Sequence, residues 1–182
     1  MRNPPHPWHV FLLFWLTIIP SGFTATLQWT NTAGGDWSVA ANWSPNQLPG
    51  TADDVVLDLP GSVTITHSSG TDSVKSALCR EAFTLSGGSL TVSNTSQWSG
   101  AFVLNGGTLS GSGDVTITGT LDWSSGSMEG SGRTIIATGA TATLSGTQNK
   151  VLSAHSGERG DDPLHRQPTL FRLVGELHEH PQ

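Results

Sequence analysis

Three tryptophans stand in polar surroundings in which an indole ring could recognise a sugar. Trp37 and Trp43 lie in a stretch rich in Ser, Asn and Gly, and Trp98 has Gln and Ser as neighbours. A flat aromatic ring matches the apolar face of a pyranose, and aromatic side chains commonly carry recognition energy. Trp37, Trp43 and Trp98 are therefore candidate carbohydrate-binding residues, with Trp98 expected at the surface. The simpler interpretation of Trp37 and Trp43 is that they join Trp29 in covering one end of a hydrophobic core.

Three aspartates close together in the sequence could bind a calcium ion. Asp53, Asp54 and Asp58 supply carboxylate oxygens, and Ca²⁺ takes about six to eight oxygen ligands. Their spacing matches neither the EF-hand loop nor the repeat of calcium-binding β-rolls. The favoured interpretation is that these aspartates are solvated carboxylates at turns and strand edges. Calcium is the only cofactor considered, and none is required.

Catalytic motifs are scarce. Asp122 and Glu129 are available for sugar hydrolysis, which needs two carboxylates about 5 to 10 Å apart, but nothing in the sequence singles them out. His67 is the only histidine in residues 26–153, and there is no nucleophile elbow, phosphate-binding loop or zinc-protease motif. The chain is predicted not to be an enzyme. A fragment of a polysaccharide lyase or hydrolase is the alternative.

A repeat of 19 residues forms the scaffold that must position these side chains. The pattern at 85–90 recurs at 104–109 and at 123–128, and a second block at 111–117 recurs with the same shift at 130–136. Two blocks that keep one period indicate a repeat architecture, whereas one Gly-Gly pair would indicate only a turn. Apolar residues fall in three columns: Phe83, Phe102 and Leu121; Leu85, Leu104 and Trp123; Leu90, Leu109 and Met128.

The repeat predicts an all-β fold, a short single-stranded β-solenoid (β-helix) with coils of about 19 residues and an N-terminal aromatic cap. Within each unit, apolar and polar residues alternate, as in a strand with one buried face. One unit is too small to hide its own apolar face, so it must stack on its neighbours at the ~4.8 Å strand spacing. A small β-sandwich is the alternative, because short strands every 8 to 12 residues or so also suit that fold.

A family resemblance rests on three motifs. Residues 37–43 read Trp-Ser-x-Ala-x-Asn-Trp, residues 49–55 read Pro-Gly-x-x-Asp-Asp-Val, and Leu-x-Gly-Gly-x-Leu repeats follow. Over residues 29–152 the chain resembles secreted bacterial β-helical repeat proteins of the adhesin or autotransporter-passenger type. The resemblance implies a structural or adhesive repeat module at a cell surface, with a polysaccharide or another surface component as its partner. A carbohydrate-binding module that uses exposed tryptophans is the second hypothesis.

Four segments are expected along the chain. Residues 1–25 resemble a signal peptide, with Arg2 before an apolar run at 10–19 that is too short to cross a bilayer. Residues 26–70 form the cap and first strands, and residues 71–153 form the solenoid. Residues 154–182 differ in composition and are expected to be a disordered or short helical tail, either native or the frame-shifted end of a truncated array. The protein is thus expected to be secreted or at the cell surface, touching a membrane only through its signal peptide.

Charge argues against one class of partner, and cysteine content argues against one kind of crosslink. The net charge is -6, and residues 26–153 contain only four Lys and Arg, which argues against nucleic acid because phosphate binding needs clustered cations. Cys79 is the only cysteine, so an internal disulfide is excluded. An uncapped last coil would present free strand edges, which makes edge-to-edge self-association possible.

Overall fold

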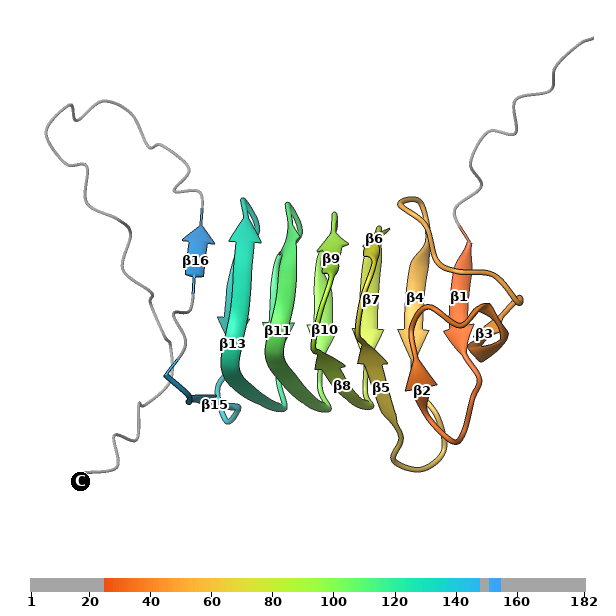
Figure 1. The fold of residues 1–182 in the computed structure, drawn as a ribbon, viewed down its shortest axis with the longest axis horizontal. Coiled ribbons are helices and arrows are strands. Elements are labelled where there is room, and N and C mark those ends of the chain that lie inside the picture. Colours follow the sequence, from red (N-terminus) through yellow and green to blue (C-terminus); the bar gives the residue numbers. More distant parts are fainter. Residues whose placement is uncertain (1–24, 148–150, 155–182) are drawn as a thin grey trace, which may run out of the picture.

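Parallel strands from successive circuits of the chain stack side by side into a β-solenoid of about five coils (Figure 1). The structure, a computed structural model, describes residues 25–147 and 151–154. The strands are β1 (Thr26–Trp29), β2 (Gly35–Asp36), β3 (Trp43–Ser44), β4 (Asp54–Leu57), β5 (Thr64–His67), β6 (Thr71–Val74), β7 (Ser76–Cys79), β8 (Ala82–Leu85), β9 (Ser89–Val92), β10 (Ser96–Trp98), β11 (Ala101–Gly111), β12 (Val115–Ile117), β13 (Thr120–Gly130), β14 (Thr134–Ile136), β15 (Thr141–Leu144) and β16 (Val151–Ala154). One 3-10 helix, η1 (Ala40–Asn42), precedes β3. The predicted β-solenoid is confirmed, and the alternative β-sandwich is wrong.

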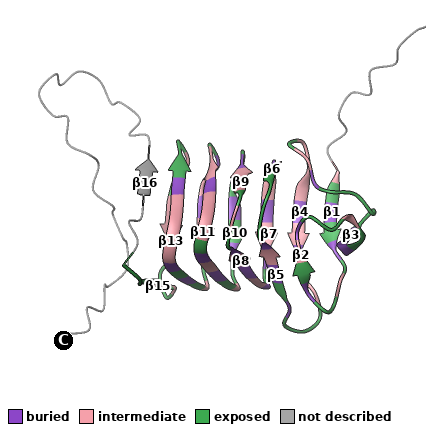
Figure 2. Ribbon diagram, in the orientation of Figure 1, coloured by how far each residue is buried: buried purple, intermediate pink, exposed green. Residues whose placement is uncertain are grey.

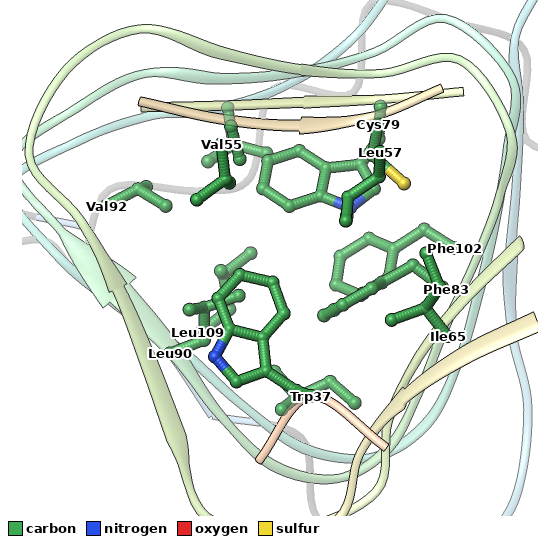
Figure 3. Packing of buried hydrophobic residues seen from close by; sticks show 14 of the residues in the cluster. Trp37, Val55, Leu57, Ile65, Cys79, Phe83, Leu90, Val92, Phe102 and Leu109 are labelled. Atoms are coloured by element: carbon green, nitrogen blue, oxygen red, sulfur yellow. The ribbon is translucent and has the colours of Figure 1, made fainter. Parts of the chain in front are cut away.

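Each coil passes through three faces. Face A contains β1, β4, β7, β10, β12 and β14; face B contains β2, β5, β8, the first halves of β11 and β13, and β15; face C contains β6, β9, the second halves of β11 and β13, and β16. The long strands β11 and β13 run continuously from face B to face C and shift register between Leu104 and Thr108. Side chains from all three faces therefore point into one interior (Figure 3).

The predicted 19-residue period is the register of the central coils. Phe83 pairs with Phe102 and Phe102 with Leu121, and the other two apolar columns align in the same way. Spacings differ toward the ends: Asp54 pairs with Ser76, Thr64 with Ala82, Thr120 with Thr141 and Ser127 with Val151. The repeat is thus regular only where the coils have neighbours of the same length on both sides.

The core is a continuous stack of inward side chains. Strands β4, β7, β8 and β9 alternate partly exposed and buried residues, and buried positions recur from coil to coil (Figure 2). Phe83, Phe102 and Trp98 form an aromatic spine, with Trp98 stacked on Phe102 at 5.6 Å between ring centroids. These rings fill the space that three short strands alone would leave open.

Close approach between coils explains a glycine of the repeat. Gly111 has a φ of 133°, and a Cβ there would lie 1.8 Å from the carbonyl oxygen of Val92 in the coil before. Any side chain would therefore collide with backbone as well as strain the turn. Gly61 has a φ of 112°, but a Cβ there would meet nothing within 4 Å, so only the glycine between stacked coils is required by packing.

The N-terminal end is closed by the predicted aromatic cap. Trp29, Trp37 and Trp43 are buried, and the Trp43 ring packs edge-on against both of the others, at 5.2 Å and 4.6 Å between centroids. Strand β3 pairs antiparallel with β1, so the outermost strand of face A runs opposite to the parallel strands behind it. Strands β1 and β2 already pair in parallel with β4 and β5, so parallel stacking extends well before residue 71.

Two predicted segments fall almost wholly outside the described residues. They are the signal peptide at 1–25, of which only Ala25 is described, and the tail at 154–182, of which only Ala154 is described. Within the described part of the chain, no helix has the length and apolar character needed to cross a membrane.

Candidate functional site

The three candidate sugar-binding tryptophans all lie in the core. Trp37 is 1% exposed, and Trp43 and Trp98 are 0% exposed. The expectation that Trp98 is exposed is wrong, because β10 turns Trp98 inward onto Phe102 and Gln97 outward. Rings enclosed in this way offer no face to a sugar, so the tryptophan-based carbohydrate site has no support from the structure.

The three candidate calcium ligands are held by separate partners. Asp53 accepts hydrogen bonds from the backbone N–H groups of Ala25 and Gly50. Asp54 pairs with Lys75, and Asp58 pairs with Arg80. Among the residues that the structure describes, no group of three or more His, Cys, Asp or Glu side chains could hold a metal ion. The structure thus gives the calcium hypothesis no assembled ligand set.

The candidate catalytic residues are also kept apart. Asp122 lies on the face B half of β13 and accepts a hydrogen bond from Ser145, whereas Glu129 lies on the face C half. His67 is fully buried, with Nδ1 2.9 Å from the carbonyl oxygen of Gly87 and Nε2 2.9 Å from a carboxylate oxygen of Asp72. Both ring nitrogens are therefore occupied by bonds that tie face B to face C, and neither serves a serine nucleophile.

Sequence reasoning missed a groove that runs along the corner between face C and face A. Its volume is about 560 Å³. Three successive coil-to-coil corners contribute side chains to it. The lining residues are Asp54, Lys75, Ser76, Ser93, Asn94, Thr95, Ser112, Gly113 and Asp114.

Backbone hydrogen bonds between the corners hold the groove in shape. The N–H of Asn94 donates to the carbonyl of Lys75 at 2.7 Å, and the N–H of Gly113 donates to the carbonyl of Val92 at 3.2 Å. Each corner directly follows a face C strand, and two of these strands end in a buried residue, Val74 or Val92. The lining residues are therefore presented by a stacked scaffold, which preorganises them as a free loop would not.

The charges in the groove cancel in pairs. Lys75 Nζ lies 2.9 Å from Asp54 Oδ2, and Arg133 binds Asp114 through its guanidinium and its backbone N–H. Hydrogen bonds from Lys75 and Ser76 lower the pKa of Asp54, and those from Arg133 lower the pKa of Asp114. Both carboxylates are thus ionised near neutral pH, and each is balanced by a cation.

The remaining lining side chains are neutral hydrogen-bonding groups. Ser93, Asn94, Thr95 and Ser112 are exposed. Ser112 Oγ donates to the carbonyl of Ser93, whereas the side chains of Ser93, Asn94 and Thr95 have no hydrogen-bond partner in the part of the chain that is described. The groove therefore presents hydroxyl and amide groups that are available to a ligand.

The fold and this groove together define a β-solenoid protein with a polar corner groove and a closed aromatic core. No protein-family model matches the chain, and neither the curated proteins nor the solved structures contain a match to it.

Proposed function

We propose that this protein is an exported, non-enzymatic structural and adhesive repeat module of a bacterial surface or secreted protein. The observation that carries the proposal is the arrangement of outward side chains in columns, one residue from each coil. Equivalent polar groups then recur at the ~4.8 Å strand spacing. A surface that repeats one chemistry many times can gain avidity from individually weak contacts.

Face C presents two outward columns of hydroxyl groups. The first contains Thr71, Ser89, Thr108 and Ser127, and the second contains Ser73, Thr91 and Ser110. Thr91 and Ser110 hydrogen-bond to each other at 2.9 Å across the coils. Such a face suits contact with a polar, hydroxylated surface better than contact with an apolar partner or with nucleic acid.

The chemistry of the groove supports adhesion over hydrolysis. A glycosidase needs one carboxylic acid with a raised pKa to protonate the leaving group. Asp54 and Asp114 both have lowered pKa values, because each accepts hydrogen bonds from a neighbouring cation. Neither is prepared to act as a general acid, which favours the adhesive proposal over a hydrolase fragment.

Beads coated with the purified full chain test the proposal. Their retention is measured on a panel of immobilised polysaccharides and bacterial surface material, while release of reducing ends from the polysaccharides is assayed in parallel. We expect retention without cleavage, lost in Gly111→Ala beads, whose added methyl group would collide with Val92. No retention on any surface, or catalytic release of reducing ends, contradicts the proposal. Export is tested separately, by N-terminal sequencing of protein secreted from a bacterial host.

A further inference from the structure

We infer that the corner groove between face C and face A binds a neutral polysaccharide. The inference rests on the proposed adhesive function and names both its site and its ligand class. The observation behind it is that Asn94 and Thr95, whose side chains lack partners in the described chain, line one groove together with two carboxylates, Asp54 and Asp114, that are each already paired with a cation.

The size of the groove fits a segment of a chain-like ligand. Its volume of about 560 Å³ lies within the range of roughly 300 to 1,000 Å³ that is usual for small-molecule sites. The groove is formed by three successive corners, which are ~4.8 Å apart along the axis. A linear polymer lying along the corner would meet similar backbone and side-chain positions in each coil.

The charge balance selects a neutral ligand. Asp54 is committed to Lys75, and Asp114 is committed to Arg133. A polyanion would have to compete with the two carboxylates for these cations, and a polycation would have to compete with the cations. A neutral ligand can leave both pairs intact and use only the uncharged groups between them.

The uncharged groups match the hydroxyl groups of a sugar. The Asn94 amide can donate and accept hydrogen bonds, and the hydroxyls of Ser93 and Thr95 can each do both. The hydroxyl columns of face C end at the same corner, where Ser93 and Ser112 follow β9 and β11 directly. A glycan in the groove therefore has further hydroxyl partners beside it on face C.

The groove is lined by no aromatic ring from the described residues, which predicts that binding depends on hydrogen bonds and is weak at each site. Each exposed hydrogen bond adds only a small contribution to binding. One groove alone is then a weak site, and strong adherence comes from many copies on one surface.

Affinity electrophoresis of the full chain tests the inference. The gels contain soluble β-glucan, mannan or galactan as neutral probes, and polygalacturonate or chitosan as charged ones. The test variant is Asn94→Ala with Thr95→Ala. The matched control is Asn105→Ala with Thr120→Ala, which removes the same two side-chain types from exposed positions outside the groove. Circular dichroism verifies that both variants keep the fold.

We expect at least one neutral polysaccharide to retard the wild-type chain and the control. The groove variant should bind it about tenfold more weakly, which is the effect of losing two exposed hydrogen bonds. Equal retardation of both variants overturns the groove as the site while adhesion stands. Retardation by charged polymers only, or none in any gel while the beads still adhere to another surface, overturns the ligand class. Failure of the beads on every surface overturns the proposed function itself.

Discussion

The N-terminal closure and the central coils stabilise the same core by different means. From β7 to β14 the chain repeats one pattern in a 19-residue register, apart from a local shift where Asn105 pairs with Ser125. From β1 to β5 the chain does not repeat, and individual side chains stabilise it. Trp43 fills the end of the core. The buried Glu81 accepts hydrogen bonds from the N–H groups of Leu59 and Val63 in the loop before β5. The coils rely on many equivalent contacts and the closure on a few individual ones.

The two regions are sensitive to different kinds of substitution. In the coils, backbone lies against backbone, so substitutions should be most destabilising at glycines where no side chain fits. In the closure, large rings cover an edge that has no further coil beyond it, and the buried carboxylate of Glu81, from the coil that follows, holds the loop before β5. Substitutions should therefore separate the two regions by mechanism.

The largest effect is expected from Gly111→Ala in the coils. The new methyl group would lie 1.8 Å from the Val92 carbonyl oxygen at a φ of 133°, so two coils must shift, and we expect more than about 4 kcal/mol of destabilisation. Gly61→Ala in the N-terminal region is the matched control. It has a positive φ but no neighbour and should cost only about 1 to 3 kcal/mol. Urea denaturation measures both, and equal losses would contradict close packing of the coils.

Trp43→Ala should come next, with a loss of about 3 to 5 kcal/mol. The ring is fully buried between Trp29 and Trp37, and its Nε1 donates to the carbonyl of Trp37 at 3.0 Å. Because the cap lies at one end, hydrogen exchange should speed up most in β1 to β3 and least in β12 and β13. Leu104→Ala, in the centre, should instead speed exchange on both sides of its coil. The same exchange pattern in both variants would show that the closure is not a separate region.

Glu81→Gln should cost about 1 to 3 kcal/mol. The two carboxylate oxygens accept from the N–H groups of Leu59 and Val63 at 2.9 Å and 3.0 Å, and the amide keeps only one of these acceptors. Glu129→Gln, at an exposed position, is the control and should change stability by less than about 0.5 kcal/mol. Thermal unfolding distinguishes them, and an unchanged midpoint for Glu81→Gln would mean that the loop does not need this side chain.

The smallest effect is expected from acid. Hydrogen bonds, from Lys75 and Ser76 to Asp54 and from Arg133 to Asp114, lower the pKa values of these two carboxyl groups below the ordinary 3.8 in the folded chain. Their contribution to stability is therefore complete well above pH 3.8 and is lost as the pH falls through that value toward the lower folded pKa. The melting temperature should be flat from pH 7 to 5 and lower at pH 3, with a smaller decline in the double variant Asp54→Asn and Asp114→Asn. An equal decline in both proteins would show that other groups govern the acid response.

The sequence predicted the regular region well, because its period places apolar residues on apolar residues. Trp98 was misjudged because only its immediate neighbours were considered. Had the register been extended to face A, Trp98 would have aligned with Ile117 and Cys79, both buried, and its place in the core would have been evident. Local polarity is thus a weaker guide than the column to which a residue belongs.

The groove could not be predicted in the same way. Its lining comes from three corners, and the Asp54–Lys75 pair falls outside the regular period. One signal was present: Ser93, Ser112 and Ser131 recur at the 19-residue interval, which indicates a polar column at a corner. The shape of the groove and the pairing of its charges depend on how the faces close, which periodicity does not determine.

Disulfide mapping of face A tests the central claim, the stacking of coils in 19-residue register, most directly. Gln97 and Thr116 are neighbours on adjacent parallel strands, ~4.8 Å apart, which lies within the reach of a disulfide. Cys79 is buried, and burial raises its pKa to about 12, so it should not compete. We expect the full chain carrying Gln97→Cys and Thr116→Cys to crosslink on oxidation. The chain carrying Gln97→Cys and Ile135→Cys, two coils apart, should not. Crosslinking of the second pair but not the first, or of both equally, would contradict the register on which the columns and the groove depend.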